Sequence, residues 1–263
     1  MKISATIITL NEAKNIRLAC ESVAWADEIV VVDSGSTDAT REIAVECGAR
    51  VLENAWPGFA EQKQFAAEHA EHEWIFSLDA DERVSDELKS SIAELRAKSA
   101  ELLADGYYVS RRAFYMGRWI RGGDWYPDRQ LRLYQKACGG WQGAYVHESV
   151  QMNAGARVEQ LQGDLLHYPF ADPLEHRRMI DERYAPLAAR KSFEQGRRTS
   201  RFEIATIGPA TFMRSFILKG GFRDGLAGFT IAKLAAHHAF LKYRLLWELQ
   251  NSESDGVRHR TGT

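Results

Sequence analysis

The chain has 263 residues, of which 45% are hydrophobic and 27% charged, an ordinary globular balance with enough apolar side chains for a core. A formal net charge of −2 excludes the global basic field typical of nucleic-acid-binding proteins, so we expect no nucleic-acid partner. Cys20, Cys47 and Cys138 give neither a disulfide framework nor metal-ligand spacing, which favours a reducing compartment.

The first hundred residues alternate apolar runs with helical patterns. The apolar runs occupy residues 3–10, 28–35, 50–54 and 73–82, and the helical patterns about 13–23, 37–48, 59–70 and 86–101. Four strand-then-helix units in succession predict an α/β fold with a mostly parallel central sheet covered by helices on both faces. The first run leads into Asn11 and Glu12 without a small-residue cleavage site, so we expect a strand rather than a signal peptide.

The expected strands end in polar, acidic residues. The ends read TLNE, VDSGSTD and LDADE, at residues 9–12, 32–38 and 78–82. In parallel sheets, ligands bind beyond the carboxyl ends of the strands. We therefore expect all three segments to open onto one ligand-binding edge.

An Asp-x-Asp motif, Asp79 and Asp81, follows the apolar run of residues 75–78. Like charges this close repel unless a positive group lies between them, and a hard divalent cation prefers oxygen ligands. The alternative is a solvated turn before a helix that Ser85 caps, with Asp86 and Glu87 in its first turn.

After about Gly106 the pattern changes. Strand-like segments separated by glycine-containing turns predict an antiparallel or mixed portion, and residues 173–193 are expected to be helical. The apolar and basic segment 212–250 predicts a pair of helices broken at Gly220-Gly221. No stretch approaches the roughly 20 apolar residues that span a bilayer. We expect two domains, 1–200 and a C-terminal basic amphipathic helical segment, 201–263.

These motifs resemble those of inverting glycosyltransferases of family two, which have the GT-A fold. The three strand ends carry the resemblance, and WYPDRQLRLY, GAYVHESV, LLHYPF and KGGFRDGLAGF add a resemblance to the lipopolysaccharide inner-core β-glucosyltransferase group. The resemblance covers about residues 3–247. It implies that a nucleotide-diphosphate sugar lies across the strand ends, with a UDP-sugar expected.

For the donor, the resemblance implies that Thr9, Asn11 and Glu12 line the base and ribose. Asp33 would accept a hydrogen bond from the base or ribose, beside Gly35, where a ligand can approach the backbone closely. The alternative for Asp33 is a carboxylate that shapes its own turn, and for Ser36 and Asp38 we favour turn formation and capping of the next helix.

The diphosphate would meet a basic side chain and a metal. Lys63 resembles the family's basic residue near the diphosphate; the alternative is a solvated helix lysine. Mg²⁺ or Mn²⁺ held by Asp81, with Asp79 nearer the ribose or a metal-bound water, would neutralise the departing diphosphate. His167 resembles a histidine that some GT-A enzymes add to the metal site, and imidazole favours Mn²⁺; the alternative is a structural histidine.

Inversion needs a general base for the acceptor hydroxyl. The family often places it as the second acid of a Glu-Asp pair, where this chain has His147-Glu148; Glu148 is the candidate and Asp128 the rival. Trp141 could stack on a sugar ring or be a core aromatic. Arg129 and Arg132 differ in strand parity, so at most one faces the phosphates.

The C-terminal segment interleaves Arg and Lys with large apolar residues, which predicts peripheral binding to an anionic membrane without a span. The alternative is two helices whose apolar faces pack on the catalytic domain. The resulting hypothesis is a cytoplasmic, metal-dependent hexosyltransferase at the inner face of the membrane, with a lipid-linked glycan acceptor such as the lipopolysaccharide inner core. The rivals are a sugar-nucleotide pyrophosphorylase and a non-catalytic membrane-attached nucleotide-sugar-binding scaffold.

Overall fold

The computed structural model describes residues 1–143, 148–170 and 172–260, with side chains up to residue 252. Two compact units divide it: residues 1–112 with 128–168, and residues 113–127 with the segment from 169 onward. The predicted domains 1–200 and 201–263 stay a prediction. In the described part, no helix is long and apolar enough to cross a membrane.

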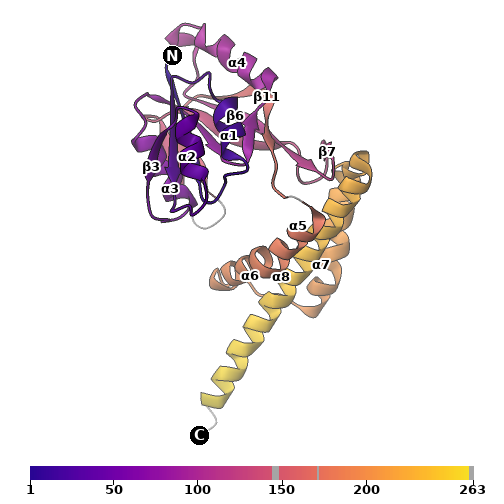
Figure 1. The fold of residues 1–263 in the computed structure, drawn as a ribbon. Coiled ribbons are helices and arrows are strands. Elements are labelled where there is room, and N and C mark those ends of the chain that lie inside the picture. Colours follow the sequence, from indigo (N-terminus) through magenta and orange to yellow (C-terminus); the bar gives the residue numbers. More distant parts are fainter. Residues whose placement is uncertain (144–147, 171, 261–263) are drawn as a thin grey trace. The chain divides into compact units, whose positions relative to one another are not determined.

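The first unit begins with the predicted strand-then-helix units (Figure 1). The strands are β1 (Ile3–Thr9), β2 (Glu28–Asp33), β3 (Arg50–Glu53) and β4 (Trp74–Asp79). The helices are α1 (Ile16–Ser22), α2 (Thr40–Glu46), α3 (Phe59–Glu68) and α4 (Asp86–Arg96). β1 pairs in parallel with both β2 and β4, and β2 with β3, which confirms the parallel sheet expected from the sequence.

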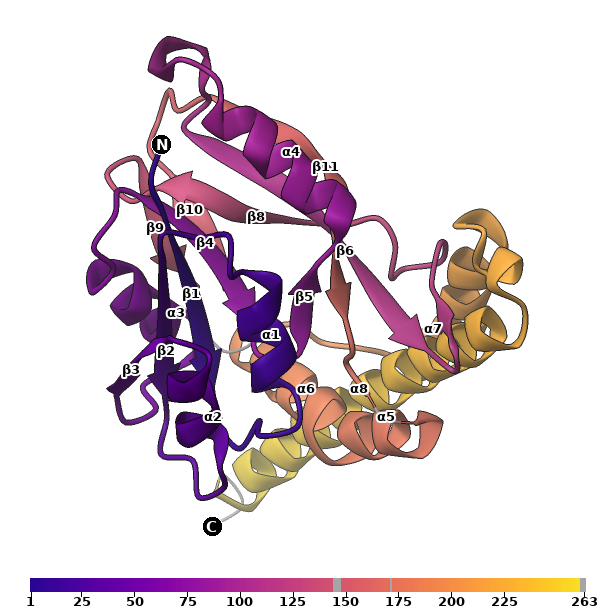
Figure 2. The same ribbon diagram turned by 45° about the horizontal axis from the view of Figure 1, so that its top comes forward.

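The second part of this unit is antiparallel, as the change of pattern predicted. Its elements are β5 (Glu82–Val84), the short helix η1 (Ala100–Leu102), β6 (Gly106–Tyr115), β8 (Asp128–Gln135), β9 (Gly139–Gln142), β10 (Ser149–Met152) and β11 (Val158–His167). β6 leads into β7 (Arg118–Trp119), which belongs to the second unit. The sheet order is β3-β2-β1-β4-β8-β6-β11-β5, with β7 paired to β6, and β9 and β10 form a separate hairpin. α4 packs against β11 (Figure 2).

The core explains why the parallel strands read as continuous apolar runs. Successive side chains of β1 enter different clusters: Ile7 packs with residues of α1 and α4, whereas Ile8 packs with residues of α3. On β2, Val31 joins the first cluster and Val30 the second. Because both faces of the sheet are covered, apolar side chains are needed on both sides of these strands.

The second unit is helical apart from the β7 hairpin. Its helices are α5 (Pro173–Met179), η2 (Ile180–Tyr184), α6 (Ala185–Glu194), α7 (Arg201–Met213), η3 (Arg214–Leu218), η4 (Gly221–Asp224) and α8 (Gly225–Arg260). α8 packs against both α6 and α7. Gly220 has a φ of 72°, and it separates η3 from η4 where the sequence predicts a break.

Candidate active site

The carboxyl ends of β1, β2 and β4 meet at one edge of the sheet. Thr9 at the end of β1 is in register with Asp33 at the end of β2, and Ile8 is in register with Asp79 at the end of β4. This confirms that the polar strand ends share an edge, because parallel strands in register must end on the same side.

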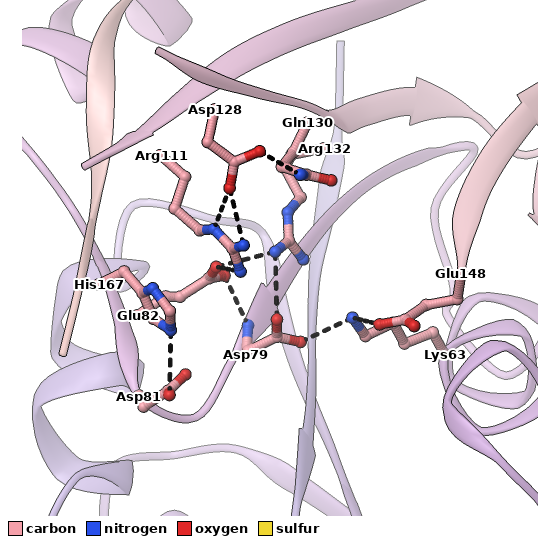
Figure 3. Close-up of polar contacts among 10 residues, drawn as sticks. All are labelled: Lys63, Asp79, Asp81, Glu82, Arg111, Asp128, Gln130, Arg132, Glu148 and His167. Atoms are coloured by element: carbon pink, nitrogen blue, oxygen red, sulfur yellow. Dashed lines mark hydrogen bonds and ion pairs between the residues drawn. The ribbon is translucent and has the colours of Figure 1, made fainter. Parts of the chain in front are cut away.

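A chain of alternating charges runs through Asp79 (Figure 3). Lys63 of α3 places its Nζ 2.9 Å from Asp79 Oδ1 and 3.1 Å from Glu148 Oε1. The Lys63 side chain is only 4% exposed. The alternative of a solvated helix lysine is therefore wrong: Lys63 is buried because its ammonium has two carboxylate partners, and it links the Asp-x-Asp motif to the candidate base.

The chain continues through two arginines. Arg132 of β8 donates from Nη2 to Asp79 Oδ2 (3.1 Å) and to Glu82 Oε1 (2.8 Å). Arg111 of β6 lies 3.4 Å from the same Glu82 oxygen, and its other nitrogens bind Asp128 Oδ2 at 2.7 and 2.8 Å. The two candidate bases, Glu148 and Asp128, thus lie at opposite ends of one network of ion pairs.

The surroundings of the side chains in this network favour their ionised forms. Although burial opposes ionisation of Asp79, the cations Lys63 and Arg132 hold its pKa well below the usual range. Burial likewise opposes the charge of Arg132, but Glu82 and Asp79 raise its pKa above the ordinary value. Each charge is stabilised by its neighbours, so the buried network is held by mutual pairing.

Sequence reasoning missed Glu82 and Arg111 and left Arg132 undecided against Arg129. Arg129 is exposed and Arg132 is buried. The signal for Arg132 is a charged residue between Leu131 and Leu133 in an otherwise apolar stretch. Among the described residues, Nε and Nη1 of Arg132 have no hydrogen-bond partner, which favours a ligand or water beside this guanidinium.

Asp81 lies outside the chain of charges and faces His167. The Asp81 Oδ2 to His167 Nε2 distance is 3.3 Å, and the two side chains are 30% and 17% exposed. A carboxylate beside an imidazole is a donor pair that suits Mn²⁺. No group of three or more acidic, histidine or cysteine side chains that could hold a metal occurs in the described part of the chain, so a cation here would take its other ligands from substrate or water.

Asp79 differs from Asp81, because both of its carboxylate oxygens lie beside cationic side chains. The donor set that fits a metal is thus Asp81 with His167. Asp79 orients Lys63 and Arg132, while its backbone N–H donates to Glu82 Oε2 (3.0 Å).

The residues after β1 form the next part of the edge. Thr9 is buried, and its hydroxyl has no hydrogen-bond partner among the described residues. Asn11 has a φ of 56° and accepts the N–H of Thr37 through Oδ1 (2.8 Å). The pKa of Glu12 is raised, mainly by burial and further by the negative charge of Asp81.

Asp33 is fully buried within its own turn. Its Oδ1 accepts the N–H groups of Gly35 (3.1 Å) and Ser36 (2.9 Å), and its Oδ2 accepts the Ser36 hydroxyl. Ser36 does not cap α2, because its hydroxyl is committed to Asp33 and to the N–H of Asn11. The turn-forming alternative for Asp33 is what the structure shows, and a ligand contact stays a prediction.

The segment before Glu148 was expected to carry a sugar-stacking tryptophan. Trp141 is instead a core aromatic, 7% exposed, and the ammonium of Lys63 lies 4.6 Å from its ring centroid. Glu148 is described and partly buried, whereas His147 lies outside the described residues. Asp128 is held from both sides, by Arg111 and by Gln130 Nε2 (2.7 Å).

The parallel sheet, its antiparallel extension and the acidic strand ends correspond to the α/β GT-A fold. The sequence of residues 4–162 matches the glycosyl transferase family 2 profile. The chain belongs to this family, and it is a glycosyltransferase of the α/β GT-A class.

Relatives match most of the chain. It is 34% identical over 251 residues to the lipopolysaccharide core biosynthesis glycosyltransferase LpsC of Rhizobium meliloti, covering 92% of this chain and 90% of the relative. It is 31% identical over 257 residues to an uncharacterized glycosyltransferase of Rickettsia typhi, covering 94% and 87%. The crystal structure of S. aureus TarS residues 1–349 is similar with a TM-score of 0.48 and 16% identity, covering 96% of this chain and 92% of that one.

Proposed function

We propose that the protein is an inverting hexosyltransferase that moves glucose from UDP-glucose onto a lipid-linked glycan such as the lipopolysaccharide inner core. The observation that carries the proposal is the strand-end site, in which Asp81 and His167 lie beside an ion-paired chain leading to Glu148. The name of the Rhizobium meliloti relative supports the acceptor class.

The donor would lie along the carboxyl edge of the sheet. Thr9, Asn11 and Glu12 line the base and ribose, and the Thr9 hydroxyl, which has no partner among the described residues, can hydrogen-bond at that position. Asp33 holds the adjacent turn, and we propose that its carboxylate also accepts a hydrogen bond from the base or ribose. Nε and Nη1 of Arg132, which no described residue accepts from, add donors for oxygens of the substrate.

A Mg²⁺ or Mn²⁺ ion would be held by Asp81 and His167, with Asp79 nearer the ribose or a metal-bound water. When bound, such an ion supplies positive charge to the departing nucleoside diphosphate. Lys63 and Arg132 fix Asp79, so Asp79 keeps its negative charge throughout the reaction.

Glu148 acts as the general base. The acceptor hydroxyl oxygen forms a bond to the anomeric carbon, the bond from that carbon to the diphosphate oxygen breaks with its electron pair leaving on the diphosphate, and the hydroxyl proton passes to the Glu148 carboxylate. Lys63 holds that carboxylate in place. Asp128, the rival, has both of its oxygens bound by Arg111 and Gln130, which favours Glu148.

A lipid-linked acceptor implies work at a membrane surface. We propose a cytoplasmic location with peripheral association at the inner face of an anionic membrane. The basic and apolar C-terminal segment supports this association.

The test is the thermal stability of the chain with uridine, guanosine, cytidine or thymidine diphosphate, each with Mn²⁺, Mg²⁺ or chelator. A ligand that binds only the folded state adds about 2.7 kcal/mol at a hundredfold excess over its Kd. We expect uridine diphosphate with metal to raise the midpoint, and Asp81→Asn to remove that shift. The absence of a shift with every nucleotide would favour a non-catalytic scaffold.

A further inference from the structure

Beyond its first residue, the exposed face of α7 carries no charge. After Arg201, every exposed position of this helix is uncharged: Phe202, Ala205, Thr206, Pro209, Ala210 and Met213. These positions recur every three to four residues, so they form one continuous stripe on the side away from α8. A helix face that meets only water normally carries charged side chains, which this stripe lacks.

The stripe continues into the turn between α7 and α8. Ile217, Leu218, Phe222 and Leu226 are all exposed there, Leu218 by 80% and Leu226 by 70%. We call the α7 stripe and these four side chains the apolar face. Contiguous exposed apolar surface of this kind marks an interaction site rather than ordinary surface composition.

The turn is held in place, so its exposed side chains are not displaced core residues. Asp224 is buried and accepts the backbone N–H of Arg121 through both oxygens, at 3.0 and 3.2 Å. A side chain at Gly228 would place its Cβ 1.9 Å from the carbonyl oxygen of Gly221, which shows how closely the two segments approach. The apolar face is therefore rigidly presented.

Cationic side chains flank the apolar face at both ends. Arg201 is exposed where α7 begins, and Arg214, Lys219 and Arg223 are exposed around the turn. Asp124 is the acid that pairs with Lys219 (2.7 Å) and Arg214 (3.4 Å), which leaves the end of the hairpin with excess positive charge. Apolar side chains flanked by cations are complementary to anionic lipid headgroups above an acyl interior.

We propose that the apolar face is a docking surface for an anionic lipid bilayer, with α7 in the headgroup region and the Ile217–Leu226 turn inserted. This deepens the membrane association in the proposed function and assigns it to α7 and the turn. On α8, Ile231, Leu234 and Leu246 are buried, whereas Leu226, Phe229 and Phe240 are exposed. A second copy of the chain fits less well, since its own cations would meet the same positive charges.

The test is co-sedimentation of the full-length chain with vesicles of phosphatidylglycerol and phosphatidylcholine, and with phosphatidylcholine alone. We expect binding to the anionic vesicles that weakens as salt is raised. Leu218→Glu/Leu226→Glu should lower the partition coefficient by about tenfold or more, because two apolar side chains no longer enter the bilayer. Leu174→Glu is the matched control, since Leu174 is 74% exposed on α5, and it should bind like the wild type.

Three results would overturn the proposal. In the first, the wild-type chain stays in the supernatant with anionic vesicles. In the second, Leu174→Glu loses as much vesicle binding as the double variant. In the third, the wild type forms a concentration-dependent dimer that the double variant does not form. If the double variant bound vesicles like the wild type but had a much lower thermal midpoint, the protein itself would cover the apolar face, which also contradicts the proposal.

An assay of sugar transfer to a detergent-solubilised acceptor tests the proposed function separately from this inference. The double variant should retain that transfer while losing vesicle binding. A wild-type chain that binds vesicles but transfers no sugar would refute the proposed function and leave the docking surface intact.

Discussion

Asp79 and Asp81 are one residue apart, yet their side chains lie in different electrostatic environments. Asp79 ends β4 between Lys63 and Arg132, and both of its oxygens are paired. Asp81 follows the strand and meets only the imidazole of His167 among the contacts described. The motif therefore divides into a carboxylate that organises the site and one that can take a ligand.

We predict that Asp81→Asn abolishes metal-dependent turnover while the thermal midpoint without ligand stays within a degree or two of the wild type. The carboxylate is partly exposed, so its removal costs little folding free energy. Asp79→Asn is the comparison: it should lower the unfolding free energy by about 2 kcal/mol, because two buried cations lose a partner. Equal stability of the two variants would contradict this division of roles.

We predict that Glu148→Gln lowers kcat by at least about a hundredfold, the range of a lost general base, and spares donor binding. Isothermal titration with the nucleoside diphosphate and single-turnover kinetics would measure the two effects separately. Asp128→Asn should leave kcat within about tenfold, since Arg111 and Gln130 already occupy its oxygens. The reverse ranking would make Asp128 the base.

At the scale of elements, the turn that joins α7 to α8 depends on close backbone approach. Gly208 and Gly228 are both buried helix-interior glycines with different surroundings. A Cβ at Gly228 would overlap the Gly221 carbonyl oxygen at 1.9 Å, whereas a Cβ at Gly208 would make an ordinary contact of 3.5 Å with the Ala236 oxygen. The sequence pattern does not distinguish them.

Gly228→Ala should therefore destabilise the chain by about 3 kcal/mol, since η4 must shift to relieve the overlap. Gly208→Ala should be neutral or stabilising by up to about 1 kcal/mol, because alanine has the higher helix propensity. Chemical denaturation of both variants measures the difference. A Gly228→Ala chain as stable as Gly208→Ala would show that the approach is looser than described.

For the whole molecule, acid sensitivity follows from a buried histidine. Burial lowers the pKa of His176 to about 4, with the charge of His238 adding to the effect, and the ring stacks on Phe170. The folded chain resists protonation of His176, whereas the unfolded chain takes up the proton near pH 6.5. The contribution of the neutral His176 to the unfolding free energy is therefore complete above pH 6.5 and is lost as the pH falls toward 4.

We predict that the unfolding free energy falls by about 3 kcal/mol between pH 6.5 and 4 through His176, since each pKa unit corresponds to about 1.4 kcal/mol. His176→Phe should flatten this part of the profile, although Tyr115 loses the partner of its hydroxyl and the variant starts less stable. Urea titrations at several pH values measure the slope. If the unfolding free energy of His176→Phe fell with pH as steeply as that of the wild type, His176 would not be the cause.

The sequence by itself determined the strand-then-helix order, the parallel sheet and the shared edge of the acidic strand ends. Continuous apolar runs can be buried only between two layers, and parallel strands must end together, so local pattern decides these features. It also indicated the proximity of His167 to Asp81 through resemblance, and the break at Gly220-Gly221 through composition.

Only the tertiary structure decided which charges pair. Lys63, Glu82, Arg111 and Arg132 come from four separate elements, and sequence spacing carries no information about which side chains meet across a sheet. The same limit explains why Asp33 was expected to face a ligand and Trp141 a sugar ring: burial depends on what packs against a residue. The uncharged exposed face of α7 likewise became evident only once α8 had covered the opposite side, because an apolar helix looks the same in sequence whether its partner is protein or lipid.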